Sequence, residues 1–134
     1  MDNLDEPSTR GRWGVALAGW CAGVSAFQVA LASGAPWGAA AWGGAHSGVL
    51  PDRLRLASGV SALAFVGVAA IAARHPHPGR RGRRGRRWVL LGMGIYLGFG
   101  VALNAMSPSV IERAIWVPLT ALGSLLAFQA WREH

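Results

Sequence analysis

The segment His75–Arg87, HPHPGRRGRRGRR, places six arginines between two long apolar runs of the chain. Short loops rich in Arg and Lys stay on the cytoplasmic side of a membrane. The segment therefore predicts a membrane span on each side of it and also predicts the orientation of these spans. Because successive spans alternate in direction, both termini of the chain are expected on the cytoplasmic side.

The composition of the chain is that of a membrane protein. Of its 134 residues 52% are hydrophobic and only 14% are charged, which is unusual for a soluble domain. A helical span needs about 20 apolar residues. The sequence predicts a single domain over residues 1–134: an all-α, integral membrane four-helix bundle, N-in/C-in. The four runs cover residues 12–31, 54–73, 88–105 and 110–131 approximately.

The basic residues predict a lipid partner for the chain. The net charge is +7, and seven of the thirteen arginines lie between Arg74 and Arg87, in a cytoplasmic Arg-rich loop over 74–87 beside two predicted spans. Anionic lipid headgroups are the nearest partner for such a loop. No aromatic residues are interleaved for base stacking, so we expect no nucleic-acid partner. The arginines expected at headgroups are Arg80, Arg81, Arg83, Arg84, Arg86 and Arg87.

The exclusive use of arginine, with no lysine, indicates a GC-rich bacterial genome and hence a multi-pass protein of the bacterial inner membrane. Redox and metal chemistry have few candidate groups. The single cysteine, Cys21, excludes an intramolecular disulfide and a thiolate metal cage. His75 and His77 lack further ligands at metal spacing, as does His46. We expect no metal and no cofactor.

Residues 32–53, between the first two predicted spans, are apolar but interrupted by glycine and proline. Irregular backbone at membrane depth must be covered by protein or water. We therefore expect an outer loop that lies in the interface or re-enters the membrane, with Trp37 and Trp42 at headgroup level. Two interpretations remain open: an interfacial lid, or one wall of an outward-facing pocket with His46 as its polar group.

The short connection between the third and fourth runs predicts an antiparallel hairpin. Either Ser107 caps the fourth helix, with Pro108 as its first residue, or Ser109 caps it, with Glu112 completing a capping box. Asp52 is expected to cap the second helix. Pro118 is expected to kink the fourth.

Most of the unusual polar residues are expected to meet on the outer side. In a structural interpretation, Glu112 caps its own helix and pairs with Arg55 or Arg113. In a functional interpretation, Glu112 is an acid or anion in a pocket, and His46 carries protons. The pocket candidates are Trp37, Trp42, His46, Asn104, Glu112, Arg113 and Trp116, and outer-rim ion pairs are expected among Asp52, Arg53 and Arg55.

The first predicted span carries a row of small residues that includes Gly19 and Gly23, spaced as GxxxG. Such a row lets another helix approach closely. We expect this face to pack within the bundle, the alternative being a homo-oligomer through small-residue helix faces. Gln28 is the one strongly polar side chain of this span, and we expect it to bond to a neighbouring helix.

Several motifs of the predicted outer side stand out: Phe27-Gln28 through Leu31, Pro36-Trp37-Gly38, Trp42-Gly43-Gly44 with His46, Gly48-Val49-Leu50-Pro51, and Asn104 with Ser107, Ser109, Glu112, Arg113 and Trp116. By these motifs the chain resembles a group of uncharacterised small four-span membrane proteins of bacteria, over nearly its whole length. The resemblance implies the four-span architecture. It implies no activity, cofactor or substrate.

The sequence thus predicts a noncatalytic binding or accessory role, with a lipid or another apolar small molecule in the outer pocket. One alternative is a membrane enzyme that acts on a lipid or isoprenoid through Glu112 and His46. Another is a transporter or a transporter subunit. The middles of the predicted spans offer few polar side chains, which argues against ion transport.

Overall fold

The computed structural model of the chain describes residues 11–74 and 79–133. Within these residues there are four long α-helices, two short 3-10 helices and no strand. The elements are α1 (Arg12–Ala32), η1 (Gly38–Ala40), η2 (Trp42–Gly44), α2 (Asp52–Ala73), α3 (Arg80–Ala105) and α4 (Val110–Arg132). All four long helices are long and apolar enough to cross a membrane. The predicted all-α arrangement of four apolar helices is confirmed.

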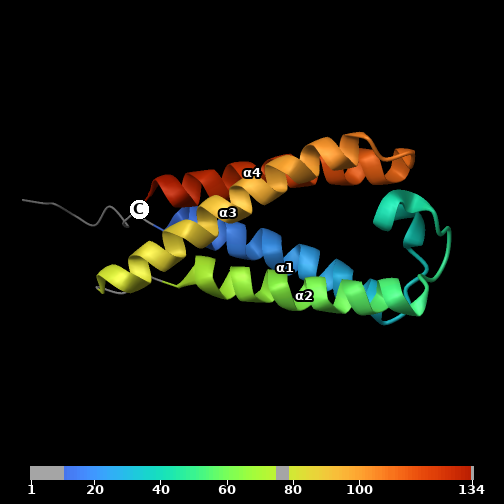
Figure 1. Cartoon of the computed structure of the whole chain (residues 1–134), viewed down its shortest axis with the longest axis horizontal. Coiled ribbons are helices and arrows are strands. Elements are labelled where there is room, and N and C mark those ends of the chain that lie inside the picture. Colours follow the sequence, from blue (N-terminus) through green and yellow to red (C-terminus); the bar gives the residue numbers. More distant parts are fainter. Residues whose placement is uncertain (1–10, 75–78, 134) are drawn as a thin grey trace, which may run out of the picture.

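The helices form two antiparallel hairpins, α1 with α2 and α3 with α4 (Figure 1). α1 also packs against α4, whereas α2 and α3 make little contact with each other. We call one end of the molecule, formed by residues 33–51 and 106–109, the loop end. We call the other end, where α3 begins and α4 finishes, the arginine end. The two hairpins spread apart toward the loop end (Figure 1).

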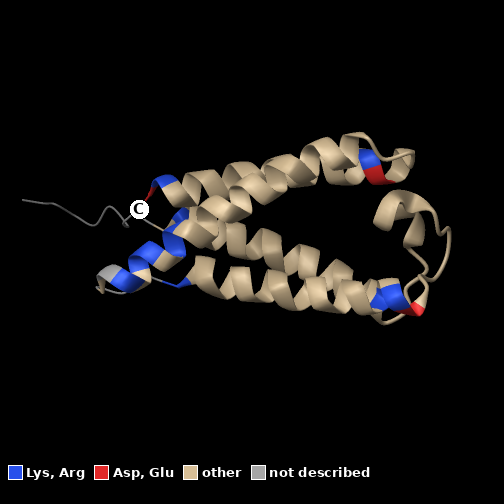
Figure 2. Ribbon diagram, in the orientation of Figure 1, with Lys and Arg blue, Asp and Glu red and all other residues tan. Residues whose placement is uncertain are grey.

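The main hydrophobic core holds the two hairpins together toward the arginine end. Its buried members come from all four helices and include Leu17, Leu90 and Ala127, none of which is exposed. A smaller cluster of Leu31, Ala41 and Leu50 lies at the loop end. The charged residues of the described chain lie at the two ends of the helices, and the helix middles carry none (Figure 2).

α3 begins at Arg80, well before its predicted start at Trp88, so part of the segment predicted as a loop is helical. Arginine is among the better helix formers, and Gly82 and Gly85 weaken the helix without breaking it. The side chains of Arg81, Arg83, Arg84 and Arg87 are exposed there. The side chain of Arg80 and residues 75–78, including His75 and His77, lie outside the described part of the structure.

Arg86 differs from its neighbours because its side chain is buried, with 8% of its surface exposed. Its Nε donates to the carbonyl of Ile71 at 3.2 Å, and its Nη2 donates to that of Ala72 at 2.9 Å. These are carbonyls of the last turn of α2, which have no partner within their own helix. The predicted headgroup contact of Arg86 is therefore wrong: this residue ties α3 to α2.

The GxxxG pair of α1 does not pack within the bundle, so the packing prediction is wrong for Gly19 and Gly23, although Ala18 of the same row packs against the main core. Gly19 and Gly23 are exposed, and a Cβ added to either would meet no atom within 4 Å. Close helix contact occurs instead at Gly14, Gly94 and Gly123. Helix α1 is apolar on all of its faces, so the sequence could not show which face turns inward. Self-association through Gly19 and Gly23 stays a prediction.

The start of α4 follows the second of the two predicted patterns. Ser109 is the N-cap, and its Oγ accepts a hydrogen bond from the backbone N–H of Glu112 at 3.2 Å. The capping box is incomplete because the Glu112 carboxylate accepts from the hydroxyl of Ser107 instead of reaching back to the N-cap. Asp52 does not cap α2; it is the first residue of the helix, after Pro51. α4 continues through Pro118.

Candidate functional site

The loop of residues 33–51 folds over the loop end and is bonded to both hairpins. On one side, the indole N–H of Trp116 in α4 donates to the carbonyl of Ala40 at 2.6 Å. On the other side, the indole N–H of Trp42 donates to Oγ of Ser58 in α2 at 3.0 Å. The loop therefore bridges the ends of the helices where the hairpins spread apart.

Left-handed backbone at residues 42–44 brings the loop onto α4. Trp42, Gly43 and Gly44 have φ values of 52°, 83° and 68°. This conformation costs energy in a residue with a Cβ, and the indole bond of Trp42 to α2 helps to hold it. At Gly44 a Cβ would also come within 2.3 Å of Cβ of Ser109. Glycine is thus required where the loop meets the start of α4.

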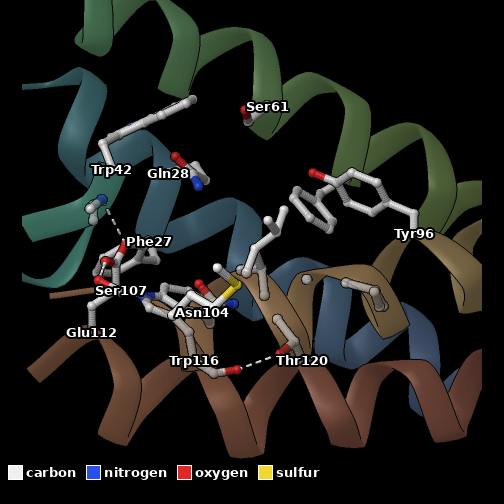
Figure 3. A pocket seen from close by; sticks show the side chains of 18 of the residues that line it. Phe27, Gln28, Trp42, Ser61, Tyr96, Asn104, Ser107, Glu112, Trp116 and Thr120 are labelled. Atoms are coloured by element: carbon white, nitrogen blue, oxygen red, sulfur yellow. Dashed lines mark hydrogen bonds between the residues drawn. The ribbon is translucent and has the colours of Figure 1, made fainter. Parts of the chain in front are cut away.

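A cavity of about 490 Å³ lies beneath this loop, between the two hairpins (Figure 3). Its volume is typical of small-molecule sites. The walls come from all four long helices and from the loop. The aromatic side chains that line it are Trp20, Phe27, Trp42, Phe65, Tyr96 and Trp116, and the polar ones are Gln28, Ser61, Asn104, Ser107, Glu112 and Thr120.

The cavity has a side opening between α2 and α3. Tyr96 and Leu103 of α3 line the cavity, yet 64% and 69% of their surfaces are exposed. α2 contributes Ser61 and Phe65 to the facing wall. Because these two helices make little contact with each other, the cavity is reached from the side of the bundle.

Glu112 is the buried acidic group of the cavity, with 6% of its surface exposed. Its Oε1 accepts a hydrogen bond from the backbone N–H of Gly43 at 3.0 Å, and its Oε2 accepts one from the hydroxyl of Ser107. Both described donors are uncharged. The side chain of Glu112 therefore fastens the loop to α4 without a charged partner among the described residues.

The predicted pairing of Glu112 with Arg55 or Arg113 is wrong. Arg55 donates to the carbonyl of Ala32 at 3.0 Å. Its guanidinium also lies 3.6 Å from the carboxylate of Asp52, and these two residues form the only ion pair among the described residues. Arg113 donates to the carbonyl of Ser107. A backbone N–H of the loop, that of Gly43, bonds to Glu112 where an arginine side chain was predicted. Arg53 is exposed and has no ion pair within the described chain.

The structure brings together part of the predicted pocket. Trp42, Asn104, Glu112 and Trp116 line the cavity. The remaining three candidates lie outside it: Trp37 stacks on Phe27 with the ring centroids 6.0 Å apart, His46 is half-buried within the loop, and Arg113 faces the 106–109 turn.

Several lining residues were not predicted, including Trp20, Phe65 and Tyr96. They lie in the apolar middles of helices, where the sequence gives no sign of which face turns inward. Gln28 stands out in the sequence as the one strongly polar side chain of its span, but its predicted bond to a neighbouring helix is wrong. Its Oε1 is buried and has no hydrogen-bond partner in the described structure.

The arrangement is suited to binding. His46 does not share the cavity with Glu112. In the described ranges no three His, Cys, Asp or Glu side chains are grouped as metal ligands. Comparison of the chain with protein-family models, curated proteins and solved structures finds no match. The resemblance to small four-span proteins of bacteria stays a prediction.

Proposed function

We propose that this protein is a multi-pass membrane protein whose cavity holds an amphiphilic molecule, a lipid or another apolar small molecule, in a noncatalytic or accessory role. The observation that carries the proposal is the cavity itself: aromatic walls from four helices, with polar groups near the loop end. Such a site fits an apolar body with one polar end. The polar groups nearest the loop end are Gln28, Asn104, Ser107 and Glu112.

Insertion into a membrane is supported by the outer surface of the helices. Leu56 and Leu63 of α2 expose 72% and 74% of their surfaces, and Phe99 of α3 exposes 69%. Apolar surface of this extent is costly in water and ordinary in lipid. The charges confined to the helix ends support the same conclusion, and the arginine end is the cytoplasmic one by the rule for basic residues.

The proposed location is the bacterial inner membrane, with both termini inside. Anionic headgroups are the proposed partners of the exposed arginines at the start of α3, which are Arg81, Arg83, Arg84 and Arg87. In this orientation the side opening of the cavity faces the outer half of the bilayer. An apolar tail can then enter from the membrane without crossing water.

Binding is favoured over the two alternatives. An enzyme acting through Glu112 and His46 needs both groups in one space, and only Glu112 lines the cavity. A transporter needs a path that continues to the other side. The core at the arginine end is closed by apolar side chains, among them Leu17 and Leu90, which have no exposed surface.

The proposal is tested by filling the cavity and identifying what copurifies. In Ser61→Phe a bulky side chain replaces a lining residue of α2. In the matched control, Ala64→Phe, the same side chain is placed on the exposed face of that helix. Mass spectrometry should find an amphiphile that is enriched with the wild type and the control and depleted in Ser61→Phe. Equal amounts in all three would overturn the proposal.

A further inference from the structure

The described side chains that line the cavity include no basic residue. Glu112 supplies a carboxylate and Tyr96 a phenol, and no arginine or histidine of the described chain lines it. A buried carboxylate is costly unless a positive charge or enough hydrogen bonds compensate it. Glu112 has one described donor on each oxygen, and each oxygen can accept another. The described residues that line the cavity therefore supply no positive charge for the Glu112 carboxyl group, which keeps spare acceptor capacity.

The tryptophans of the cavity can contact an occupant with their ring faces, but their indole N–H groups are not free to donate to it. The indole N–H groups of Trp20, Trp42 and Trp116 already donate to Leu119 O, Ser58 Oγ and Ala40 O, respectively. An anionic headgroup would thus lose its water and find neither a guanidinium nor an indole donor. A phosphate at this site is disfavoured further by the charge of Glu112.

Aromatic faces attract cations because the quadrupole of the ring makes its face partially negative. Trp116 lies one helical turn after Glu112 on α4 and contacts Phe27, with the ring centroids 5.0 Å apart. Trp42 lies next to Gly43, the backbone donor to the carboxylate. Figure 3 shows these rings and Glu112 around the same part of the cavity. Rings and a carboxylate together are the recognition chemistry of an organic ammonium group.

We infer that the occupant of the cavity is an amphiphilic organic cation: an ammonium group is held by Glu112 and the neighbouring rings, and the apolar body lies along Phe65, Tyr96 and Leu97 toward the side opening. The inference rests on the proposed function, because it names the class of molecule held by the same cavity. It distinguishes a cationic occupant from a neutral alcohol and from an anionic lipid.

Three probes with the same tail test this inference: dodecyltrimethylammonium, dodecanol and dodecyl phosphate. Each is titrated into the full chain in phosphatidylcholine nanodiscs, and tryptophan fluorescence is measured. Ser61→Phe, titrated in parallel, accounts for partitioning into the bilayer. We expect the ammonium probe to bind about tenfold more tightly than the alcohol, and the phosphate to give no signal beyond that of Ser61→Phe.

Glu112→Gln keeps an acceptor for Gly43 and removes the charge. It should weaken binding of the ammonium probe about tenfold and weaken binding of the alcohol much less, so that the preference for the ammonium probe is lost. If the alcohol or the phosphate binds the wild type as tightly as the ammonium does, the inference is overturned and the proposed function stands. If no probe gives binding that Ser61→Phe abolishes, both are overturned. The comparison of probes on the wild type holds even if Glu112→Gln does not fold.

Discussion

The backbone N–H of Gly43 donates a hydrogen bond of 3.0 Å to Oε1 of Glu112, and this contact joins the covering loop to the first turn of α4. The sequence alone pairs Glu112 with an arginine, which would have neutralised its charge. Because the actual partner is a backbone amide, Glu112 holds the loop over the cavity and has no charged partner of its own. The same carboxyl group therefore serves both the closure of the loop and the lining of the cavity.

The first prediction follows from that bond. Glu112→Ala leaves the half-buried N–H of Gly43 without its acceptor, and the cost of about 1–3 kcal/mol for a fully buried donor without a partner is the upper limit of the expected loss. Glu112→Gln should cost less, because its amide oxygen can still accept. The measurement is thermal unfolding in detergent, in which Glu112→Ala should have the lowest Tm of the three proteins.

A double-mutant cycle with Arg55→Gln is the control, because Arg55 bonds to Ala32 and Asp52 and not to Glu112. Residues without a shared partner add within about 0.5 kcal/mol. A larger coupling energy between positions 55 and 112 would indicate an ion pair between Arg55 and Glu112, which the structure excludes. A wild-type Tm for Glu112→Ala would show that the loop is held without this bond.

The second prediction separates two arginines near the start of α3. Arg86 is buried on the carbonyls of α2, whereas Arg84 is exposed. Arg86→Gln should lower the Tm, because it removes hydrogen bonds to buried carbonyls. Arg84→Gln should leave the Tm unchanged and lower the retention of phosphatidylglycerol on purification, at about 1 kcal/mol per basic residue near an anionic surface.

The ratio of anionic to zwitterionic lipid that copurifies with each variant is the second readout of this pair. If Arg86→Gln lost anionic lipid while keeping its Tm, Arg86 would belong to the headgroup contact after all. The two substitutions are matched in chemistry and lie on the same helix. They differ in burial, so a difference between them reports on position.

The four helices were predictable because the length of an apolar run and its flanking charges set a span, and both are local in sequence. The start of α3 was not, since arginine is compatible with both a helix and a loop. Arg86 is buried because the end of α2 lies beside its side chain. The relative position of α2 and α3 results from the packing of the two hairpins and cannot be read from the sequence.

The candidate site was partly predictable for the same reason. Trp42, Asn104, Glu112 and Trp116 lie near helix ends or in the loop, where polar and aromatic residues stand out in the sequence. Trp20 and Phe65 lie in helix middles that are apolar on every side. Lipid tails are as apolar as a protein core, so hydrophobic pattern does not distinguish the inward face of such a helix from the outward one.

The third prediction is the orientation of the bundle. Cys21 has no exposed surface, so the native protein should react little with a membrane-impermeant maleimide. Ser47 in the covering loop and Gly79 before α3 are both exposed, at opposite ends of the molecule. In bacterial spheroplasts Ser47→Cys should be labelled at once, and Gly79→Cys only after the membrane is opened, because the arginine end is retained inside. Labelling of Gly79→Cys but not of Ser47→Cys in sealed spheroplasts would reverse the orientation and place the cavity in the inner half of the bilayer. Labelling of both variants in sealed spheroplasts would contradict a transmembrane bundle altogether.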